Sequence, residues 1–394
     1  MAATTVAPPE AATMTAAQDL NDDVVTEILL RLPSAAVLRS RAVCKAWRRI
    51  TTSPAFLAAH ARGRPLELIV QRYGVSGAIL DTIPLLTLDE TGRRCLHVEY
   101  PLYTGPPEPF WRGYSLIGSC DGLLLFERGV GIDYFIYSPV TRQWAKLPRP
   151  PGTFMRLCAF YLHGPSGEHR ILYLTNDQEG SHYVSSLEAP EARRLGPAVP
   201  VATYDITPPF FCLNHRGRLH WLQHPWVMFP GEAPEVARAD KILAFDTVSE
   251  AFRRISCPPR RRTRCHEDVF FMLEMDGKLA LAASLEVSMD IWVLEDYDDD
   301  RSWAHRVRIH LPPALRHATF AMNPGGDQSV ILLGNRWNAK VGLYHLTEKR
   351  VLKQIKFVTS DQPGDVAPRT KLNTLVFRDS LEPPAFFDSP PEPQ

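Results

Sequence analysis

The chain has 394 residues, too many for one small domain but enough for two or three domains, or for one large repeat architecture with an appendage. A composition of 45% hydrophobic and 22% charged residues excludes wholesale disorder. Lysine plus arginine and aspartate plus glutamate each number 44, so the net charge of zero gives no overall field that would draw the chain onto nucleic acid or an anionic membrane.

Residues 1–17 are rich in Ala, Thr and Pro and predict a disordered N-terminus without the basic and apolar regions of a secretion signal. The seven cysteines are dispersed, odd in number and never spaced C-x-x-C, which is typical of neither a disulfide framework nor a zinc site. No apolar run approaches the roughly 20 residues of a membrane helix. These features predict a cytoplasmic or nuclear protein with reduced thiols.

The segment 18–60 has helical periodicity. A first helix is predicted after Asn21, a suitable N-cap, with Val25, Ile28, Leu29 and Leu32 at i, i+3, i+4 and i+7, and it ends at Pro33. A second helix is predicted from Ser34 to Ile50, with Val43, Trp47 and Ile50 on one face, and a third from Ser53. Three such helices cannot hide all their apolar side chains, so the excess must dock on the rest of the chain or on another protein.

The sequence LNDDVVTEILLRLPSAAVLRSRAVCKAWRRITTSPAFLAAH resembles an F-box. Its agreement with the F-box pattern runs through EILLRLP, the R-x-R-x-V-C-K-x-W-R stretch and the closing S-P-x-F, although Asn21 stands where proline is usual. The resemblance implies a three-helix domain that binds the Skp-type adaptor of an SCF ubiquitin ligase. By that resemblance, the side chains that face or brace the adaptor are Leu20, Ile28, Leu29, Leu32, Pro33, Leu38, Val43, Cys44 and Trp47.

Basic residues cluster in the same segment without an acid between Pro33 and Gly63. They are Arg39, Arg41, Lys45, Arg48 and Arg49. A solvated helix face and complementarity to an acidic adaptor surface are both compatible with this cluster.

Residues 61–380 change to an extended pattern, with short β-branched or aromatic segments such as GLLLF, DYFIY and KILAF bounded by turn residues. Two signals repeat at about fifty residues, the period of kelch-like propeller blades. One is a turn glycine before an apolar strand, at Gly122, Gly167, Gly217, Gly277 and Gly326. The other is an aromatic residue seven positions before an apolar one, as in Tyr137/Trp144, Phe245/Phe252 and Tyr344/Val351.

Six repeats fit this length, and KLNTLVFRD near residue 375 can supply a strand that closes the ring on the first blade. Five or seven blades, or two stacked sandwiches, are the alternatives. GSCDGLLLF followed by FIYSPVTRQWAKLP is similar to the repeats of plant F-box-associated domains, with Ser138 in place of the usual asparagine. The expected architecture is therefore mainly β with a small N-terminal α domain: a three-helix F-box at 18–60, a roughly six-bladed β-propeller-like domain at 61–380 and a disordered Pro-rich tail at 381–394.

Catalytic and metal-binding motifs are missing from the sequence: it has no G-x-G-x-x-G, P-loop, H-E-x-x-H or G-x-S-x-G. The acidic run 295–300 lacks the glycine and distal glutamate of a calcium loop and predicts a solvated hairpin tip. We therefore expect no catalytic residues, no metal and no cofactor.

Three loops carry aromatic and arginine residues of the kind that anchor protein interfaces, although each residue could instead cap its own blade. They are 103–114, 223–240 and 334–338, and the candidate target-binding residues are Phe110, Trp111, Trp226, Phe229, Arg336 and Trp337.

The resemblance implies a non-catalytic substrate-recognition subunit of an SCF (cullin-RING) ubiquitin ligase. Its partners would be a Skp-type adaptor, through it the cullin and RING subunits, and an unknown target protein, with no nucleic acid or membrane. An F-box scaffold outside any ligase is one alternative. A propeller enzyme such as a glycosidase is another, and it would need paired carboxylates in the central channel.

Overall fold

The structure is a computed structural model. It describes residues 21–73, 77–99, 114–129, 133–147, 155–175, 181–187, 191–195, 212–223, 241–258, 269–285, 287–335, 340–357 and 370–381. The chain divides into two units, a helical unit up to Gly63 and a β unit from Arg64 onward. The predicted disorder at 1–17 and in 382–394 lies outside the described residues. None of the described helices has the length and apolar content that crossing a membrane requires.

Residues 21–63 form four helices rather than the predicted three. They are α1 (Asp22–Arg31), α2 (Ser34–Ser40), α3 (Lys45–Thr52) and α4 (Pro54–Gly63). The predicted second helix breaks after Ser40, whose hydroxyl donates to the Val37 carbonyl at 2.6 Å. Cys44 is extended and its sulfur accepts from the Trp47 amide, so it caps a new helix. Val43 therefore lies in a turn and does not share a helix face with Trp47.

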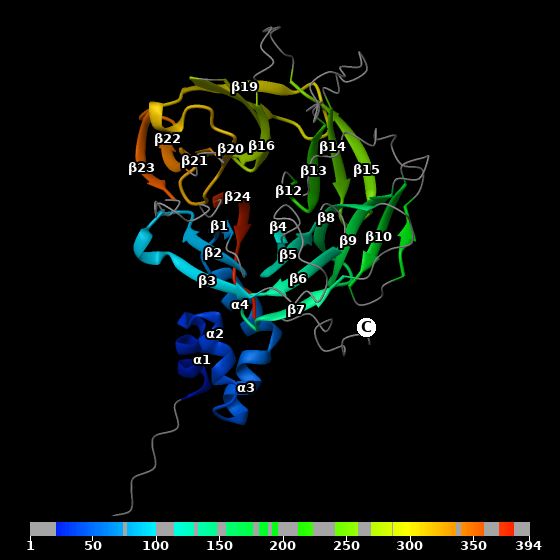
Figure 1. The fold of residues 1–394 in the computed structure, drawn as a ribbon, viewed down its shortest axis with the longest axis vertical. Helices are drawn as coiled ribbons and strands as arrows, with labels where there is room; N and C mark the ends of the chain where they lie inside the picture. The colour runs from blue at the N-terminus through cyan, green and yellow to red at the C-terminus, as the bar shows by residue number, and fades with distance from the viewer. Residues whose placement is uncertain are drawn as a thin grey trace, which may run out of the picture. The chain divides into compact units, whose positions relative to one another are not determined.

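The described strands from Glu67 to Phe377 assemble into six four-stranded antiparallel sheets, arranged as blades around a ring (Figure 1). Blade 1 contains β1 (Glu67–Tyr73), β2 (Gly77–Pro84) and β3 (Arg94–Glu99), completed by β24 (Thr370–Phe377). Blade 2 contains β4 (Tyr114–Cys120), β5 (Leu123–Arg128), β6 (Asp133–Ser138) and β7 (Gln143–Lys146). Blade 3 contains β8 (Met155–His163), β9 (Glu168–Thr175), β10 (His182–Ser186) and β11 (Arg193–Arg194).

Blade 4 contains β12 (Leu213–His215), β13 (Arg218–Gln223), β14 (Lys241–Asp246) and β15 (Ala251–Ser256). Blade 5 contains β16 (Val269–Met275), β17 (Lys278–Ser284), β18 (Ser288–Leu294) and β19 (Trp303–His310). Blade 6 contains β20 (Phe320–Met322), β21 (Val330–Asn335), β22 (Lys340–His345) and β23 (Arg350–Lys356). The short 3₁₀ turns η1 (Glu90–Gly92) and η4 (Pro313–Leu315) lie between described strands. The predictions of a mainly β chain and of six blades are confirmed.

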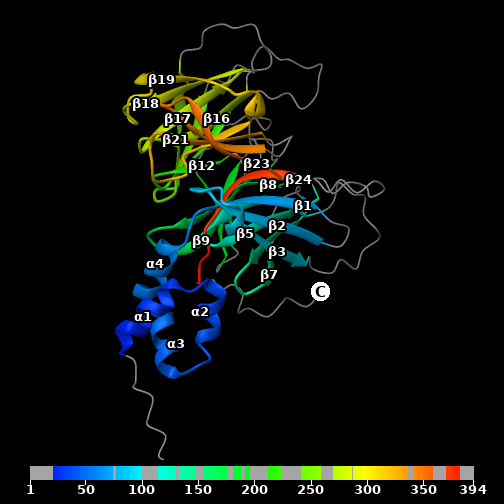
Figure 2. The same ribbon diagram turned by 90° about the vertical axis from the view of Figure 1, so that its left-hand side faces the viewer.

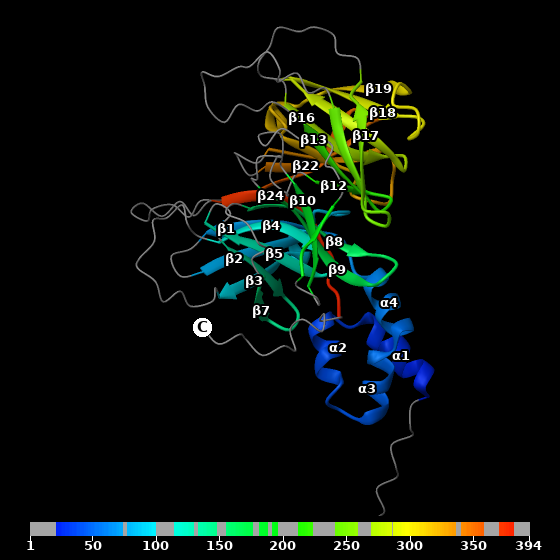
Figure 3. The same cartoon turned by 90° about the vertical axis from the view of Figure 1, so that its right-hand side faces the viewer.

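Strand β24 closes the ring. It pairs antiparallel with β1 and forms the inner strand of blade 1, as expected from the KLNTLVFRD segment (Figures 2 and 3). At one end of this blade, Arg94 of β3 forms ion pairs with Glu67 of β1 and with Asp379, the latter at 2.8 Å. The segment that follows the closing strand is thus tied to the outermost strand of blade 1.

The repeating turn glycines join the first and second strands of five blades, and all five have positive φ. At Asp121–Gly122, Arg216–Gly217 and Asp276–Gly277 both turn residues have positive φ, the geometry of a two-residue type I′ hairpin. The glycine repeat in the sequence therefore corresponds to a turn that recurs between the first two strands of five blades.

The seven-residue aromatic spacing has an equally direct cause. Tyr137 and Trp144, Phe245 and Phe252, and Tyr344 and Val351 are directly opposite one another on the third and fourth strands of their blades. Such facing side chains are the packing unit of an antiparallel pair.

The hydrophobic core lies between the blades. Each of the six clusters of buried side chains combines residues of two neighbouring blades, for example Leu68 and Ile83 of blade 1 with Phe320 and Leu332 of blade 6. A single blade cannot bury both of its faces, so this packing explains why the ring must close.

Candidate functional site

Helix α1 has two different apolar faces. Val25 and Leu29 are buried, and Leu29 is completely inaccessible. Val24 and Ile28, one turn apart, are 46% and 43% exposed. The predicted quartet at i, i+3, i+4 and i+7 is therefore divided: two members stabilise the helical unit, Leu32 is intermediate, and Ile28 is available to a partner.

The turn between α2 and α3 presents a second apolar group. Val43 is 64% exposed, and the adjacent Cys44 is also exposed. Leu38 and Trp47 are only partly buried, while Pro33 is exposed between α1 and α2. Large apolar side chains exposed at this level on a small unit are typical of an interaction surface.

Polar contacts hold these helices in place. The Asn21 side chain caps α1 by accepting from the Asp23 amide, and Arg49 of α3 pairs with Asp22 of α1 at 2.5 Å. His60 of α4 lies 2.9 Å from the Leu32 carbonyl at the end of α1. These polar contacts connect α1 to α3 and to α4.

The basic cluster contains two kinds of residue. Arg41 is half-buried and donates to the Thr51 carbonyl at 2.9 Å, and burial followed by the charge of Arg48 lowers the pKa of Arg41. Arg39, Lys45 and Arg48 are exposed, and none forms an ion pair with another residue that the structure describes. Three unneutralised cations therefore flank the exposed Val43 and Cys44 in the chain.

The structure places the predicted adaptor-binding residues unevenly. Ile28, Pro33, Val43 and Cys44 are exposed, and Leu32, Leu38 and Trp47 are intermediate. Leu29 is internal, so its role is to support the helical unit, and Leu20 lies outside the described residues. Val24 was not predicted, and the signal that could have found it is its position four residues before Ile28.

In the β unit, the six predicted target-binding residues all lie outside the described part of the chain. The strands that flank their loops are described: β3 and β4, β13 and β14, and β21 and β22. The first of each pair is the fourth or the second strand of its blade, and because strands alternate in direction, these strands all end on the same face of the ring. The loops themselves lie outside the described residues.

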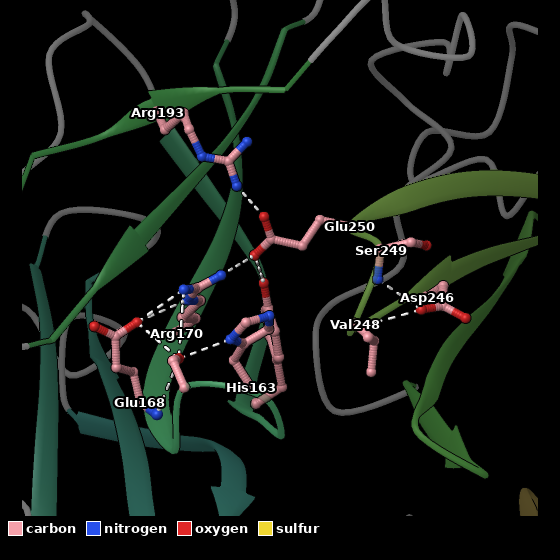
Figure 4. A network of polar contacts seen from close by, with 10 residues as sticks. His163, Glu168, Arg170, Arg193, Asp246, Val248, Ser249 and Glu250 are labelled. Atoms are coloured by element: carbon pink, nitrogen blue, oxygen red, sulfur yellow. Dashed lines mark hydrogen bonds and ion pairs between the residues drawn. The ribbon is translucent and has the colours of Figure 1, made fainter.

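The opposite face carries short turns joined by polar contacts between blades. Glu250 of blade 4 is almost buried and accepts from Tyr161 and Arg170 of blade 3 at 2.9 and 2.7 Å, while Arg193 approaches from its other side (Figure 4). In the same turn, backbone hydrogen bonds, that from Ser249 foremost, lower the pKa of Asp246. This network joins two blades and rigidifies the scaffold.

The sequence predicts a solvated hairpin tip for the acidic run 295–300, but residues of this run also contact the neighbouring blade 4. Tyr297 lies between the guanidinium groups of Arg218 and Arg253, each 4.9 Å from the ring centroid. Asp300 accepts from the Ser256 amide at 3.1 Å. This hairpin therefore fastens blade 5 to blade 4. Over the described ranges, no three His, Cys, Asp or Glu side chains are arranged to hold a metal ion.

These features define a two-part protein in which a small helical unit with an exposed apolar surface is joined to a six-bladed β-propeller. Comparison with known families gives the same result. A profile described as F-box associated beta propeller domain matches residues 107–350, and one described as F-box domain matches residues 18–58. The chain belongs to the F-box-associated β-propeller family and carries an F-box, as both resemblances implied.

Several proteins of Arabidopsis thaliana are similar along most of their length. F-box protein CPR1 is 23% identical over 390 residues, which cover 90% of this chain and 88% of that protein. F-box protein At5g18160 is 26% identical over 309 residues, 74% of this chain and 70% of the relative. Among solved structures, a chain of the crystal structure of a nidogen/laminin complex aligns with a TM-score of 0.41 and 10% identity, over 74% of this chain and 94% of that one, a likeness too low to support an inference. An F-box in general indicates binding to a Skp-type adaptor.

Proposed function

We propose that this chain is the substrate-recognition subunit of an SCF ubiquitin ligase. The helical unit binds a Skp-type adaptor, which connects it to cullin and RING subunits, and the propeller binds a target protein. The observation that carries the proposal is the exposed apolar set Val24, Ile28 and Val43 on an F-box, accompanied by cations that form no ion pair with a described residue.

The apolar set provides the affinity. Burying a valine or isoleucine side chain completely contributes about 1.5–3 kcal/mol, so covering three half-exposed side chains contributes several kcal/mol. Ile28 and Val43 belong to the residues that the F-box resemblance assigns to the adaptor, and Val24 extends the set.

The cations provide orientation and association rate. Arg39, Lys45 and Arg48 are exposed and unneutralised by described residues, so an acidic partner surface would be attracted to them. This attraction should weaken with ionic strength, since the Debye length falls to about 8 Å at physiological salt.

The propeller presents the target. Because the strands that precede their three loops end on one face of the ring, we propose that target contacts come from Phe110, Trp111, Trp226, Phe229, Arg336 and Trp337. The chain itself needs no catalytic residue, because holding the target beside a charged conjugating enzyme raises the effective concentration of the target's lysines. We also propose a cytoplasmic or nuclear location, which a fluorescent fusion would test; among the described residues, the six cysteines form no disulfide.

Capture by an immobilised Skp-type adaptor tests the proposal. The variant Ile28→Asp with Val43→Asp should lose capture by at least about tenfold, because charge replaces the apolar contact. The matched control is Val248→Asp with Leu352→Asp, two exposed positions on the propeller, 58% and 39% accessible, which should be captured like wild type. Equal capture of both double variants, each shown to be folded by circular dichroism, would refute the assignment of the docking surface.

A further inference from the structure

Lysines are few in this chain and unevenly distributed. There are nine lysines and 35 arginines, and residues 61–339 contain only three of the nine. Four others lie in blade 6, at positions 340, 349, 353 and 356. Both side chains carry positive charge, but a lysine amine can accept ubiquitin and an arginine guanidinium cannot. The position of each lysine therefore matters for a chain that we place in a ubiquitin ligase.

Carboxylates bind three of the propeller lysines. The Lys146 amine lies 3.0 Å from an oxygen of the buried Asp133, and Lys278 pairs with Glu295. In blade 6, Lys353 lies 4.0 Å from a carboxylate oxygen of the segment that follows β2. Each of these amines must leave its carboxylate before it can react with another molecule.

The hairpin of β22 and β23 presents two lysines differently. Lys349 lies in the turn and Lys356 ends β23; both are exposed, and neither forms an ion pair with a residue that the structure describes. A glutamate adjoins Lys349 in the chain, but the carboxylate of this Glu348 is bound by Arg350 at 2.5 Å. The turn thus neutralises its acid with arginine and leaves the lysine amine accessible.

The helical unit contains one further exposed lysine, Lys45, which also forms no ion pair with a described residue. It lies beside Val43 and Cys44 in the proposed docking surface, where the adaptor would cover it. Lys340 is only partly exposed. Among the propeller lysines whose side chains the structure describes, Lys349 and Lys356 are therefore the two that combine exposure with no ion pair to a described residue.

We propose that Lys349 and Lys356 are the positions at which the ligase attaches ubiquitin to this chain itself. The lysine amine, after its proton passes to solvent, attacks the carbonyl carbon of the thioester between ubiquitin and the conjugating enzyme. An amide C–N bond forms, the C–S bond breaks, and the cysteine of the conjugating enzyme leaves as a thiol, so nothing is oxidised or reduced. The inference rests on the proposed function, because the same tethering that concentrates the lysines of a target also concentrates those of the receptor.

A reconstituted ligase without a target tests the inference. The full chain, a Skp-type adaptor, cullin and RING subunits are incubated with activating and conjugating enzymes, ATP and lysine-free ubiquitin, so that each attached ubiquitin reports one acceptor. Tryptic mass spectrometry should find the glycine–glycine remnant of ubiquitin on Lys349 and Lys356. Replacing both, Lys349→Arg with Lys356→Arg, should reduce attachment at least about fivefold, because arginine keeps the charge but accepts no ubiquitin.

The matched control is Lys146→Arg with Lys278→Arg, which also keeps the charges and should change attachment less than about 1.5-fold. Equal losses in the two double variants, or remnants mainly on other lysines or on the N-terminal amine, would overturn the inference. Capture by the adaptor without attachment at Lys349 or Lys356 would overturn this inference alone, whereas failure of capture would overturn the proposed function as well.

A second measurement needs no adaptor. When the isolated folded chain is acylated with an N-hydroxysuccinimide ester, Lys349 and Lys356 should be modified faster than Lys146 and Lys278, because their amines are exposed and form no ion pair with a described residue. Slower modification of the hairpin lysines would contradict the accessibility on which the inference depends.

Discussion

The helical unit and the propeller distribute their apolar side chains differently. The described helical unit buries four hydrophobic side chains, Val25, Leu29, Val37 and Phe56, and exposes three large ones. The described part of the much larger propeller exposes only five, and its buried residues form six continuous clusters between blades. The propeller is therefore stabilised by its own core, whereas the helical unit leaves part of its apolar surface exposed, where the proposed adaptor would bind.

The largest expected effect is a loss of propeller stability when the closure of the ring is disturbed. Gly122 has φ +78°, and a Cβ there would lie 2.6 Å from the Ser380 backbone nitrogen, just after the closing strand. Gly122→Ala should lower the free energy of unfolding by about 3 kcal/mol or more. Gly167→Ala is the control, because φ is +71° but no atom lies within 4 Å, and it should cost only about 1 kcal/mol. Equal losses in urea unfolding would show that ring closure is not involved.

A smaller effect separates folding from docking within α1. Leu29→Ala should destabilise the helical unit by about 3 kcal/mol, because it leaves a cavity at a fully buried position. Ile28→Ala should cost less than about 1 kcal/mol of stability while weakening adaptor capture. Hydrogen exchange resolved by segment checks both, with unchanged protection of the propeller as the internal control. Similar losses of protection for the two variants would contradict the two-faced description of α1.

The smallest expected effect is a loss of propeller stability at acidic pH. Burial lowers the pKa of His182 and of His220 to about 4, below the ordinary 6.5. The unfolded chain therefore binds protons first as pH falls below 6.5, so stability present at pH 7 is lost towards pH 4, by about 1–2 kcal/mol per histidine at pH 5. The His182→Phe variant, which keeps a ring against Phe252, should lose less stability between pH 7 and pH 5 than wild type. If the variant and wild type lose the same stability between pH 7 and pH 5, then His182 is not a cause of that loss.

Much of the propeller could be predicted because its signals are local. The glycine at each type I′ turn and the seven-residue spacing of Tyr137 and Trp144 are set by residues of one hairpin. Closure by the segment near residue 375 followed from counting repeats, since six repeats fit before Val358 and leave this segment over as an additional strand.

The errors arose where the spacing of apolar residues alone does not determine the structure. The break at Cys44 depends on a sulfur accepting from the Trp47 amide, and helical periodicity continues through it. Ile28 and Leu29 are equally apolar in the sequence, and only the packing of the other helices distinguishes them. Tyr297 sits in an acidic run that indicates a solvated loop, until Arg218 and Arg253 from another blade are brought against it.

Closure of the ring by β24 also sets the timing of folding during synthesis. Strand β1 leaves the ribosome about 300 residues before its partner, which at roughly 5–20 residues per second means a wait of about 15–60 s. Throughout that interval one edge of β1 has no partner strand and can pair with other chains. A nascent chain cut before residue 370 would keep that edge permanently, so chaperones that recognise open strand edges should bind truncated products and release complete ones.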